Sequence, residues 1–381
     1  MSMHTTYDAI VVGMGAMGSS ALYHLATRGL KVLGIERFNI PHEMGSSHGI
    51  TRIIRLAYFE HPSYVPLLQR SFELWKELEN RTGEELLHIT GSIDAGPPDS
   101  EVVQGSRRSC AAYDLPHELL TSRELRRRFP GFRLPDGAMA LFQPQGGFLL
   151  PERCISTHVM VAQSLGAEVH AREQVLSWEA HPDHVEVRTE AGTYRGKRLI
   201  LAAGAWMPRV APMLKEIAVP ERQVLAWFQP AKVELFAPAR FPVFNLRVEE
   251  GHFYGFPVFG VPGFKIGRYH HLSEVVDPEI MDRACHPRDE QILRQCAEKY
   301  FPDGAGPTMS MHACIFTNTP DEHFILDLCP GVPQVVLCSA CSGHGFKFSS
   351  VIGEILADLA QKGETRHDIS LHRVSRFSTI A

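Results

Sequence analysis

Three glycines near the start of the chain have the spacing of a nucleotide-binding turn. Gly13, Gly15 and Gly18 follow a short apolar stretch, residues 7–12, and precede a run that predicts a helix. Gly13 permits a tight turn, Gly15 allows the backbone to approach a pyrophosphate, and Gly18 lets the helix pack close to the strand. The unpaired N–H groups and the positive dipole end of that helix would then face the phosphates. The chemistry that we expect of this turn is the binding of a dinucleotide.

A second strand and an acidic residue complete the pattern. Residues 32–35 are apolar and lead to Glu36, whose carboxylate is placed to accept hydrogen bonds from a ribose. Glycines also occur in ordinary turns. If only the three glycines are considered, a turn that binds no ligand is therefore the alternative interpretation. The full strand, turn, helix and strand context favours a dinucleotide, although it does not distinguish NAD from FAD.

A cysteine and a second glycine turn lie near the other end of the sequence. Cys314 starts a predicted passage from strand to loop, residues 314–324, and the turn at residues 342–345 contains Gly343 and Gly345 and enters a predicted helix. The N–H groups at such a helix start can contact another part of a large anionic or electron-rich cofactor. The alternatives are a cysteine buried for packing and a capped tight turn.

The elements that must position these residues alternate along the chain. Amphipathic spacing predicts a helix over 61–80, and further helices are expected over 123–129, 151–166 and 346–362. Small residues, Ala203 and Gly204, follow the predicted strand 198–201 and would let the backbone approach the same cofactor.

We therefore expect an α/β fold with a Rossmann-type nucleotide-binding domain and a second, mainly antiparallel-sheet substrate domain (α+β). The nucleotide-binding domain is predicted to be discontinuous, with residues 1–88, 149–219 and 322–381. Residues 89–148 and 220–321 are assigned to the substrate domain, because strand-rich segments with many aromatic residues and prolines are concentrated there.

The composition excludes several classes of function. The 381 residues are 44% hydrophobic and 21% charged, which is typical of a globular chain long enough for two domains. A net charge of −5 gives no basic surface for nucleic acid. No apolar run reaches the ~18 to 20 residues of a membrane span, and the first strand begins too early for a signal peptide. A cytoplasmic location is predicted.

The cysteines show no disulfide framework. Eight are spread through the sequence, so we expect reduced thiols. Cys338 and Cys341 form a CxxC pair, for which a redox or metal role is the alternative to packing. Because no second CxxC or nearby histidine set accompanies it, packing is favoured and no metal site is predicted.

Six separated motifs resemble the monomeric sarcosine oxidase and N-methyltryptophan oxidase family, which belongs to the D-amino-acid-oxidase-like superfamily. They cover essentially the whole chain, in order, which makes the resemblance specific. The motifs are VVGMGAMG at 11–18, GSSHGITRIIR at 45–55, FYGFP at 253–257, FKIGRYH at 264–270, TPDEHFILD at 319–327 and SGHGFKFSS at 342–350.

The resemblance implies FAD as the cofactor, attached covalently through its 8α-methyl group to Cys314. It also implies that Arg55 and Lys347 hold a substrate carboxylate, and that Lys265 lies over the flavin and promotes its reaction with oxygen. Two cations suit a carboxylate, and a fixed positive charge would stabilise superoxide. Taken singly, Arg55 could form a surface ion pair, and either lysine could be solvated.

The resemblance assigns further positions to the same site. Catalytic positions are Lys265, Arg52, His270 and Tyr254, and substrate-side positions are Arg55, Lys347, Tyr58, Phe316 and Cys341. Cofactor-side positions are Gly13, Gly15, Gly18, Glu36, Arg37, His48, Val175, Ala203, Gly204, Trp206, Cys314, Gly343, Gly345 and Lys347.

Two positions depart from the family pattern. Phe316 stands where relatives carry tyrosine, which removes a hydroxyl from the pocket wall. Cys341 stands where a larger apolar residue precedes the SGHG turn, which could enlarge the pocket. Both departures leave the flavin chemistry intact and bear on the substrate.

The predicted reaction is oxidation of a secondary amine, with an N-methyl amino acid such as sarcosine as substrate. Hydride passes to FAD, O2 is reduced to H2O2 and the imine is hydrolysed. The expected partners are the small amine and O2, without nucleic acid or membrane, and the chain is expected to be a monomer. An alternative substrate is a bulkier or cyclic amine of the N-methyltryptophan, pipecolate, proline or alkaloid type. Other readings are an NAD-dependent or FAD-dependent dehydrogenase, a non-enzymatic flavin-binding subunit and an FAD-dependent hydroxylase.

Overall fold

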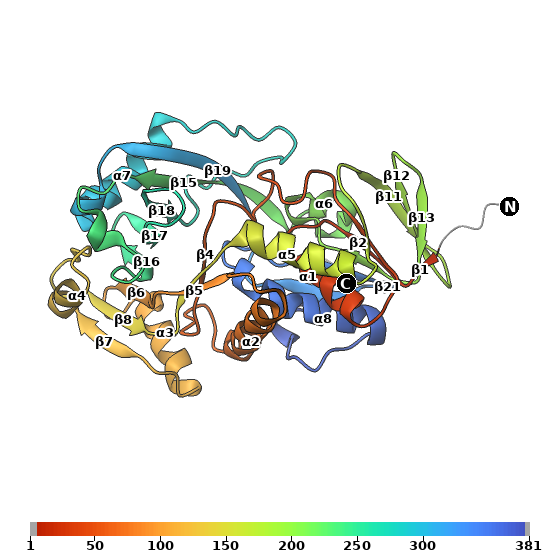
Figure 1. Ribbon diagram of the computed structural model, residues 1–381, viewed down its shortest axis with the longest axis horizontal. Coiled ribbons are helices and arrows are strands. Elements are labelled where there is room, and N and C mark those ends of the chain that lie inside the picture. Colours follow the sequence, from red (N-terminus) through yellow and green to blue (C-terminus); the bar gives the residue numbers. More distant parts are fainter. Residues whose placement is uncertain (1–5, 378–381) are drawn as a thin grey trace.

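The computed structural model describes residues 6–377, and these residues form two large β-sheets (Figure 1). The first has six strands in the order β10-β3-β2-β14-β21-β20. All neighbours are parallel except β20 and β21. The bounds are β2 Ala9–Val12, β3 Val32–Ile35, β10 Glu168–His170, β14 Leu199–Leu201, β20 Ile325–Cys329 and β21 Val332–Ser339. Apart from the edge strand β10 and the first three residues of β21, these strands are almost wholly buried, as expected for a parallel sheet covered by helices.

Helices from distant parts of the sequence pack beside this sheet. They are α1 Ala16–Thr27, α2 Tyr64–Thr82, α5 Pro151–Ser164 and α8 Ser349–Lys362. Helix α1 packs against both α5 and α8. At the crossing with α8, a Cβ on Gly353 would lie 2.1 Å from Ser20 Oγ. The absence of that Cβ allows the two helices to approach closely.

The second sheet has eight strands in the order β19-β15-β18-β17-β16-β6-β8-β7. It is antiparallel except between β6 and β16. The bounds are β6 Ser92–Gly96, β7 Glu118–Thr121, β8 Met139–Gln143, β15 Val219–Phe228, β16 Val243–Val248, β17 Gly251–Phe256, β18 Phe264–Arg268 and β19 Thr308–Asn318. An aromatic cluster fills its core, in which Phe132, Phe241, Phe244 and Phe301 pack edge to face or stacked.

Two smaller sheets complete the fold. One contains β1 Thr6–Tyr7, β11 Val175–Ala180, β12 Val185–Thr189 and β13 Thr193–Gly196, and it lies at the end of the molecule opposite β7 (Figure 1). The other joins β4 Arg52–Ile54, β5 Leu87–Ile89 and β9 Gly147–Leu149. Strand β4 carries Arg52 from the motif at residues 45–55.

The structure confirms the α/β class with a parallel nucleotide-binding sheet and a mainly antiparallel second sheet. The helices expected near 61–80, 123–129, 151–166 and 346–362 are present as α2, α4 Ser122–Arg128, α5 and α8, the last preceded by a 3-10 turn at Phe346–Phe348. Helices α3 Glu101–Ala112 and α7 Pro287–Tyr300 are not predicted from the sequence. The buried face of α3 consists partly of Gly105, Ser106 and Ser109, which gives a weak apolar pattern. The proposed domain boundaries stay a prediction.

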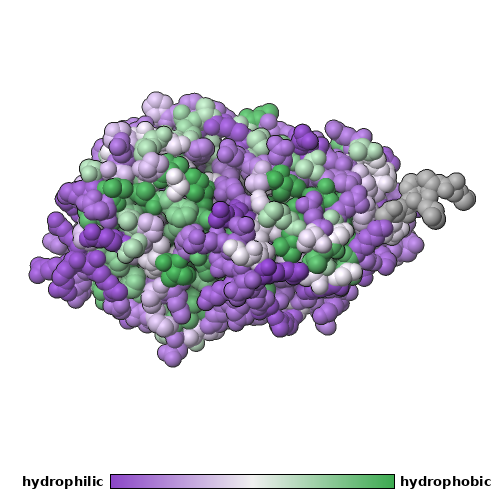
Figure 2. All heavy atoms as spheres, in the orientation of Figure 1, coloured by the Kyte–Doolittle hydropathy of each residue, from purple (hydrophilic) through white to green (hydrophobic). Residues whose placement is uncertain are grey.

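The surface and the cysteines agree with the composition. All eight cysteines are free thiols, as predicted. Within residues 6–377, none of the helices combines the length and apolar character that crossing a bilayer requires. Most of the face seen in Figure 2 is hydrophilic, and its hydrophobic residues lie in several separate areas.

Candidate active site

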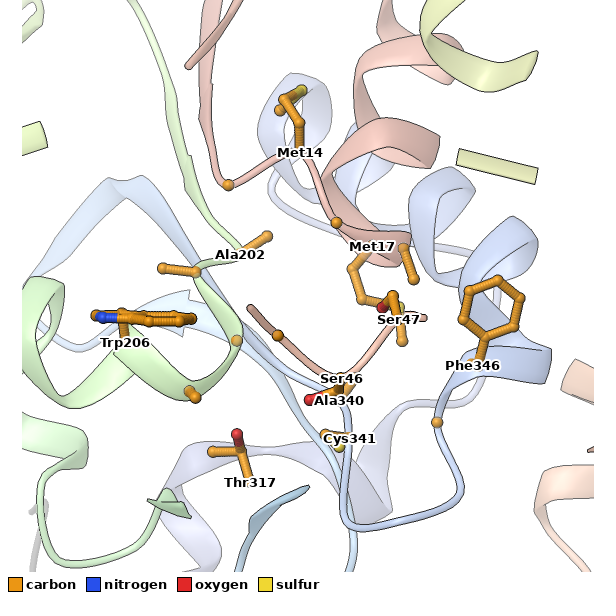
Figure 3. A pocket seen from close by; sticks show the side chains of 18 of the residues that line it. Met14, Met17, Ser46, Ser47, Ala202, Trp206, Thr317, Ala340, Cys341 and Phe346 are labelled. Atoms are coloured by element: carbon orange, nitrogen blue, oxygen red, sulfur yellow. The ribbon is translucent and has the colours of Figure 1, made fainter. Parts of the chain in front are cut away.

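A cavity lies at the carboxyl ends of the parallel strands and continues to the second sheet. Its wall includes Val12 at the end of β2, Glu36 after β3, Ala202 after β14 and Ser339 at the end of β21. Ligands of open α/β sheets bind at this edge. In Figure 3, Met14 and Met17 enter the wall from the first turn and helix, Trp206 from the segment after β14, Thr317 from β19, and Cys341 and Phe346 from the C-terminal turn.

The first glycine turn forms one part of the wall. Gly13 has φ +91°, and a Cβ there would lie 2.5 Å from the Ala202 carbonyl oxygen. A Cβ on Gly15 would meet only Ser47 Oγ, at 4.0 Å, so the backbone faces open space. Gly18 is not on the wall, and its Cβ would lie 1.7 Å from the Gly13 carbonyl oxygen. Gly13 and Gly18 therefore shape the turn, while Gly15 leaves room for a ligand.

Glu36 is buried on the cavity wall and held by backbone amides. One carboxylate oxygen accepts from Met14 N–H at 2.8 Å, and the other accepts from Phe38 N–H at 2.9 Å. Burial opposes ionisation, but the hydrogen bond and charge of His42, together with the two amides, lower the pKa of Glu36. The side chain is therefore an acceptor in a fixed orientation, as recognition of a ribose requires.

Five other residues that were predicted to bind the cofactor also line the cavity. These are Arg37, Val175, Ala203, Gly204 and Trp206. Trp206 Nε1 donates to Glu279 at 2.9 Å, and the same carboxylate accepts from Arg37. This contact ties the segment after β3 to the loop before α7.

Cys314 lies on the wall in the C-terminal half of β19 and is buried. Its nearest polar groups are Arg52 Nη2 at 3.7 Å and the Ser46 carbonyl oxygen at 3.8 Å from Sγ. Burial raises the pKa of the thiol, and the positive charges of Arg52 and Lys265 act in the opposite direction. The free thiol is therefore protonated, in surroundings whose charges favour a thiolate.

Lys265 lies behind this part of the wall. Its Nζ donates to the Gly49 carbonyl at 2.7 Å, to the Thr51 carbonyl at 2.8 Å and to Thr51 Oγ1 at 2.9 Å, and it lies 4.2 Å from the centre of the Phe256 ring. Burial and then the charge of Arg52 lower the pKa of Lys265 well below its ordinary value. Three acceptors match the three donors of an ammonium. Arg52 and Phe256, which surround Lys265, line the cavity themselves.

The two cations predicted to hold a carboxylate are placed differently. Lys347 is 4% exposed and lines the cavity, and its Nζ donates to the His344 carbonyl at 2.6 Å. Burial, followed by Arg55, lowers the pKa of Lys347 to about 7. Arg55 does not line the cavity, and its Nη2 contacts both oxygens of Glu60, at 3.0 and 2.9 Å.

Four more predicted residues lie outside the wall. Tyr58 is buried and bonded to His344 Nδ1. His48 is buried too, and burial lowers its pKa to about 3.

His270 instead lies between Glu221 and Glu322, at 3.1 and 2.9 Å, and hydrogen bonds to these carboxylates raise its pKa to about 10. Gly18, as described above, is the fourth.

Phe316 and Cys341 are on the wall, as predicted, together with Tyr254. A Cβ on Gly343, which has φ +72°, would lie 2.7 Å from the Phe316 ring. The glycine turn thus packs directly on this ring, and only a residue without a side chain fits there.

Sequence reasoning missed several wall residues. The most prominent is Tyr269, which lines the cavity and packs 5.0 Å from Tyr254, ring centre to ring centre. It stands inside the FKIGRYH motif, next to the predicted His270, so this motif could have identified Tyr269 as a site residue. Other missed wall residues that lie within or next to a motif are Ser46, Ser47, Phe256, Thr317 and Phe346.

The wall fits a large dinucleotide cofactor. Gly15 leaves open space at the turn, and Glu36 offers its carboxylate. The hydroxyls of Ser46 and Thr317 are buried on the wall without a hydrogen-bond partner. Buried polar atoms normally have partners, so a ligand with polar groups of its own would satisfy them.

Comparison with known proteins gives matches over almost the whole chain. The family described as DAO, FAD dependent oxidoreductase, matches residues 8–359. The monomeric sarcosine oxidase of Streptomyces avermitilis is 42% identical over 99% of both chains, and that of Bacillus sp. strain NS-129 is 41% identical over 98% of both. The N-methyl-L-tryptophan oxidase of Yersinia pestis is 35% identical over 97% of this chain and 99% of its own.

Solved structures share the fold. NikD, an unusual amino acid oxidase essential for nikkomycin biosynthesis, superimposes with a TM-score of 0.84 at 26% identity, over 97% of each chain. The L-proline dehydrogenase of P. horikoshii gives a TM-score of 0.85 at 21% identity, over 99% of each chain, and shows the fold alone.

Proposed function

The chain belongs to the family of FAD-dependent oxidoreductases, and on that premise we propose that it oxidises a secondary amine, most simply an N-methyl amino acid such as sarcosine. It is an FAD-dependent amine oxidase that acts on CH–NH donors. The observation that supports this substrate is a single cavity, which is lined by the glycine turn, by Cys314 and by the buried side chain of Lys347.

When bound, FAD would supply the redox chemistry, namely acceptance of a hydride equivalent from the carbon beside the amine nitrogen and transfer of the electrons to O2. The protein's part is to hold and orient both molecules. The open backbone at Gly15 and the helix start behind it suit a pyrophosphate, and Glu36 suits a ribose hydroxyl. The unpaired hydroxyls of Ser46 and Thr317 are available to polar groups of the cofactor.

We propose that FAD is attached covalently through Cys314. The thiol lies on the cavity wall, and a thiolate is the nucleophile that such an attachment requires. Arg52, at 3.7 Å from Sγ, stabilises that thiolate against the cost of burial. In its ammonium form, which burial disfavours, Lys265 would add a second positive charge behind the wall and would favour electron transfer to oxygen.

Lys347 is the residue that we assign to the substrate carboxylate. An ammonium enclosed by the protein loses hydration, which lowers its pKa to about 7, and an approaching carboxylate restores the charged form. Tyr254, Tyr269 and Phe316 add an aromatic wall that excludes water from the rest of the substrate. Arg55 is not assigned to the carboxylate, since its Nη2 is paired with Glu60 and its Nη1 donates to the Ala57 carbonyl.

A bulkier or cyclic amine is the second candidate substrate. Cys341 contributes only a small side chain to the wall, and one relative is an N-methyl-L-tryptophan oxidase. We infer that the substrate range is decided beside Cys341 and Phe316, because both depart from the family pattern.

The proposal is tested by anaerobic mixing of the purified protein with sarcosine, N-methyl-L-tryptophan, L-proline and a broader panel of secondary amines. Loss of the oxidised flavin absorbance, followed by stoichiometric H2O2 release on admission of O2, is the expected result. Full retention of the absorbance with every amine would exclude the proposed reaction. We further propose that the chain acts as a monomer in the cytoplasm, which sedimentation and cell fractionation would test.

A further inference from the structure

A hairpin far from the amine-oxidising site gathers two histidines and a glutamate. His181 and His184 flank the turn between β11 and β12, and Glu186 follows on β12 (Figure 1). One ligand atom from each side chain lies within 4.8 Å of the others. This grouping is independent of the proposed function.

Local backbone geometry produces the grouping. His181 N–H donates to the His184 carbonyl at 2.8 Å, which closes a two-residue turn and places the two histidines opposite each other. Glu186 is two residues further along the strand and therefore points to the same face as His184. The imidazole rings are stacked, with centres 4.6 Å apart and planes at 16°.

The histidine nitrogens have the pattern of metal ligands. His184 Nδ1 lies 2.8 Å from Asp183 Oδ1, so the carboxylate holds a proton on Nδ1 and leaves the lone pair on Nε2. A carboxylate behind the ring is the usual arrangement for a histidine that binds a metal. Nε2 of His184 and Nε2 of His181 are both enclosed without a hydrogen-bond partner.

Glu186 is compatible with an ion despite its pairing with Arg195. Arg195 Nε and Nη2 contact the same carboxylate oxygen, Oε1, at 2.8 and 2.7 Å. Oε2 is outside both contacts. The side chain of Glu186 can therefore neutralise Arg195 and offer its second oxygen to a cation.

We propose that His181, His184 and Glu186 bind one divalent transition-metal ion of the Zn²⁺ class. Imidazole nitrogens and a carboxylate suit borderline ions such as zinc, and three protein ligands leave a position for water. The turn is anchored to β21, since Gln334 Nε2 donates to the His181 carbonyl at 3.1 Å. The same hairpin supplies Val175 to the cavity wall, so the ion would brace a strand beside the cofactor.

The test uses the flavin-loaded enzyme, stripped of metal with a chelator and desalted. Zinc chloride is then titrated against a chromophoric zinc indicator, and melting temperature is followed in parallel. We expect one equivalent of Zn²⁺ bound with micromolar affinity and a higher melting temperature, because an ion that binds only the folded state stabilises it. His181→Ala and His184→Ala should each weaken binding at least tenfold, and Glu186→Gln should weaken it less.

His286→Ala is the matched control, because His286 also lies 2.7 Å from a carboxylate, that of Asp282, but is stacked with no second imidazole among residues 6–377. This variant should keep the bound equivalent. The proposal is overturned if the wild-type protein binds no zinc below millimolar concentration, or if a His181→Ala/His184→Ala variant with an unchanged flavin spectrum still binds one equivalent with unchanged affinity.

Discussion

The two ends of the cavity hold their functional groups in different ways. At the glycine turn the backbone does the positioning, since Gly13 and Gly18 shape the turn and main-chain amides fix Glu36. Around Cys314 and Lys347 the groups are ionisable side chains enclosed in protein, and their pKa values are shifted by burial. The first end depends on local geometry and the second on electrostatics in a dry site.

The largest expected effect is at the proposed covalent link. Cys314→Ala should remove covalently bound flavin completely, because it removes the thiol that we propose forms the link. Acid precipitation followed by mass spectrometry of the digested protein measures this directly. Cys341→Ala, which changes another cysteine of the same wall, should retain the flavin mass on the Cys314 peptide. Flavin that stays bound through denaturation in Cys314→Ala would place the link elsewhere.

At the other end, a single methyl group should be enough to disturb cofactor binding. Gly13→Ala places a Cβ 2.5 Å from the Ala202 carbonyl oxygen at φ +91°, so we expect a large loss of FAD content. Gly29→Ala is the control, because its φ of +76° is equally unusual for alanine but nothing lies within 4 Å of the added Cβ. The flavin-to-protein absorbance ratio compares the two, and equal ratios would show that the contact with Ala202 has no effect.

Lys347→Met tests the electrostatic end. Loss of a buried charged partner costs about 2–5 kcal/mol, so kcat/KM for an N-methyl amino acid should fall by about 30-fold or more. An amine without a carboxylate should lose far less. Lys362→Met, at the exposed end of α8, is the control and should leave both values unchanged. If kcat/KM fell equally for the two kinds of amine, Lys347 would not be the residue that binds the carboxylate.

The same lysine predicts a pH dependence. Because the pKa of Lys347 in the free protein is about 7, its ammonium is present below pH 7 and is lost as the pH rises through that value. The affinity for a small carboxylic acid without an amine should therefore fall above pH 7, by at most tenfold for each pH unit. Flavin difference spectra can measure its affinity, and Lys347→Met should abolish the dependence.

The smallest effect is expected at His270, which lies outside both ends. Its pKa is raised in the folded protein, so its pairs with Glu221 and Glu322 stabilise the fold fully below about pH 6.5 and cease to do so as the pH rises through about 10. The side chain is 40% exposed, so solvent screening limits the contribution to about 1 kcal/mol. Urea unfolding of His270→Gln at pH 6 and pH 10.5 should show a deficit only at pH 6.

The sequence predicted the glycine end more fully than the substrate end. The residues from 7 to 36 act through spacing along one strand, one turn and one helix, which are local properties. Arg55 shows the limit, because its pairing with Glu60 keeps it off the wall although its motif matches the family. Tyr269 was missed because one motif contains both Tyr269 and His270, and only the tertiary structure shows which of the two lines the cavity.

The amino-acid sequence by itself determined the Rossmann-type turn and the alternation of α/β and strand-rich segments, since these follow from short-range spacing. Its resemblance to a known family identified the candidate cysteine and cations. Only the tertiary structure decided which of those side chains share a cavity. It brings Gly15 of the first turn, Cys314 of β19 and Lys347 of the last turn to one wall. It also enclosed Lys347 and Lys265, and the pKa of a lysine depends on the solvent that the surrounding chain removes.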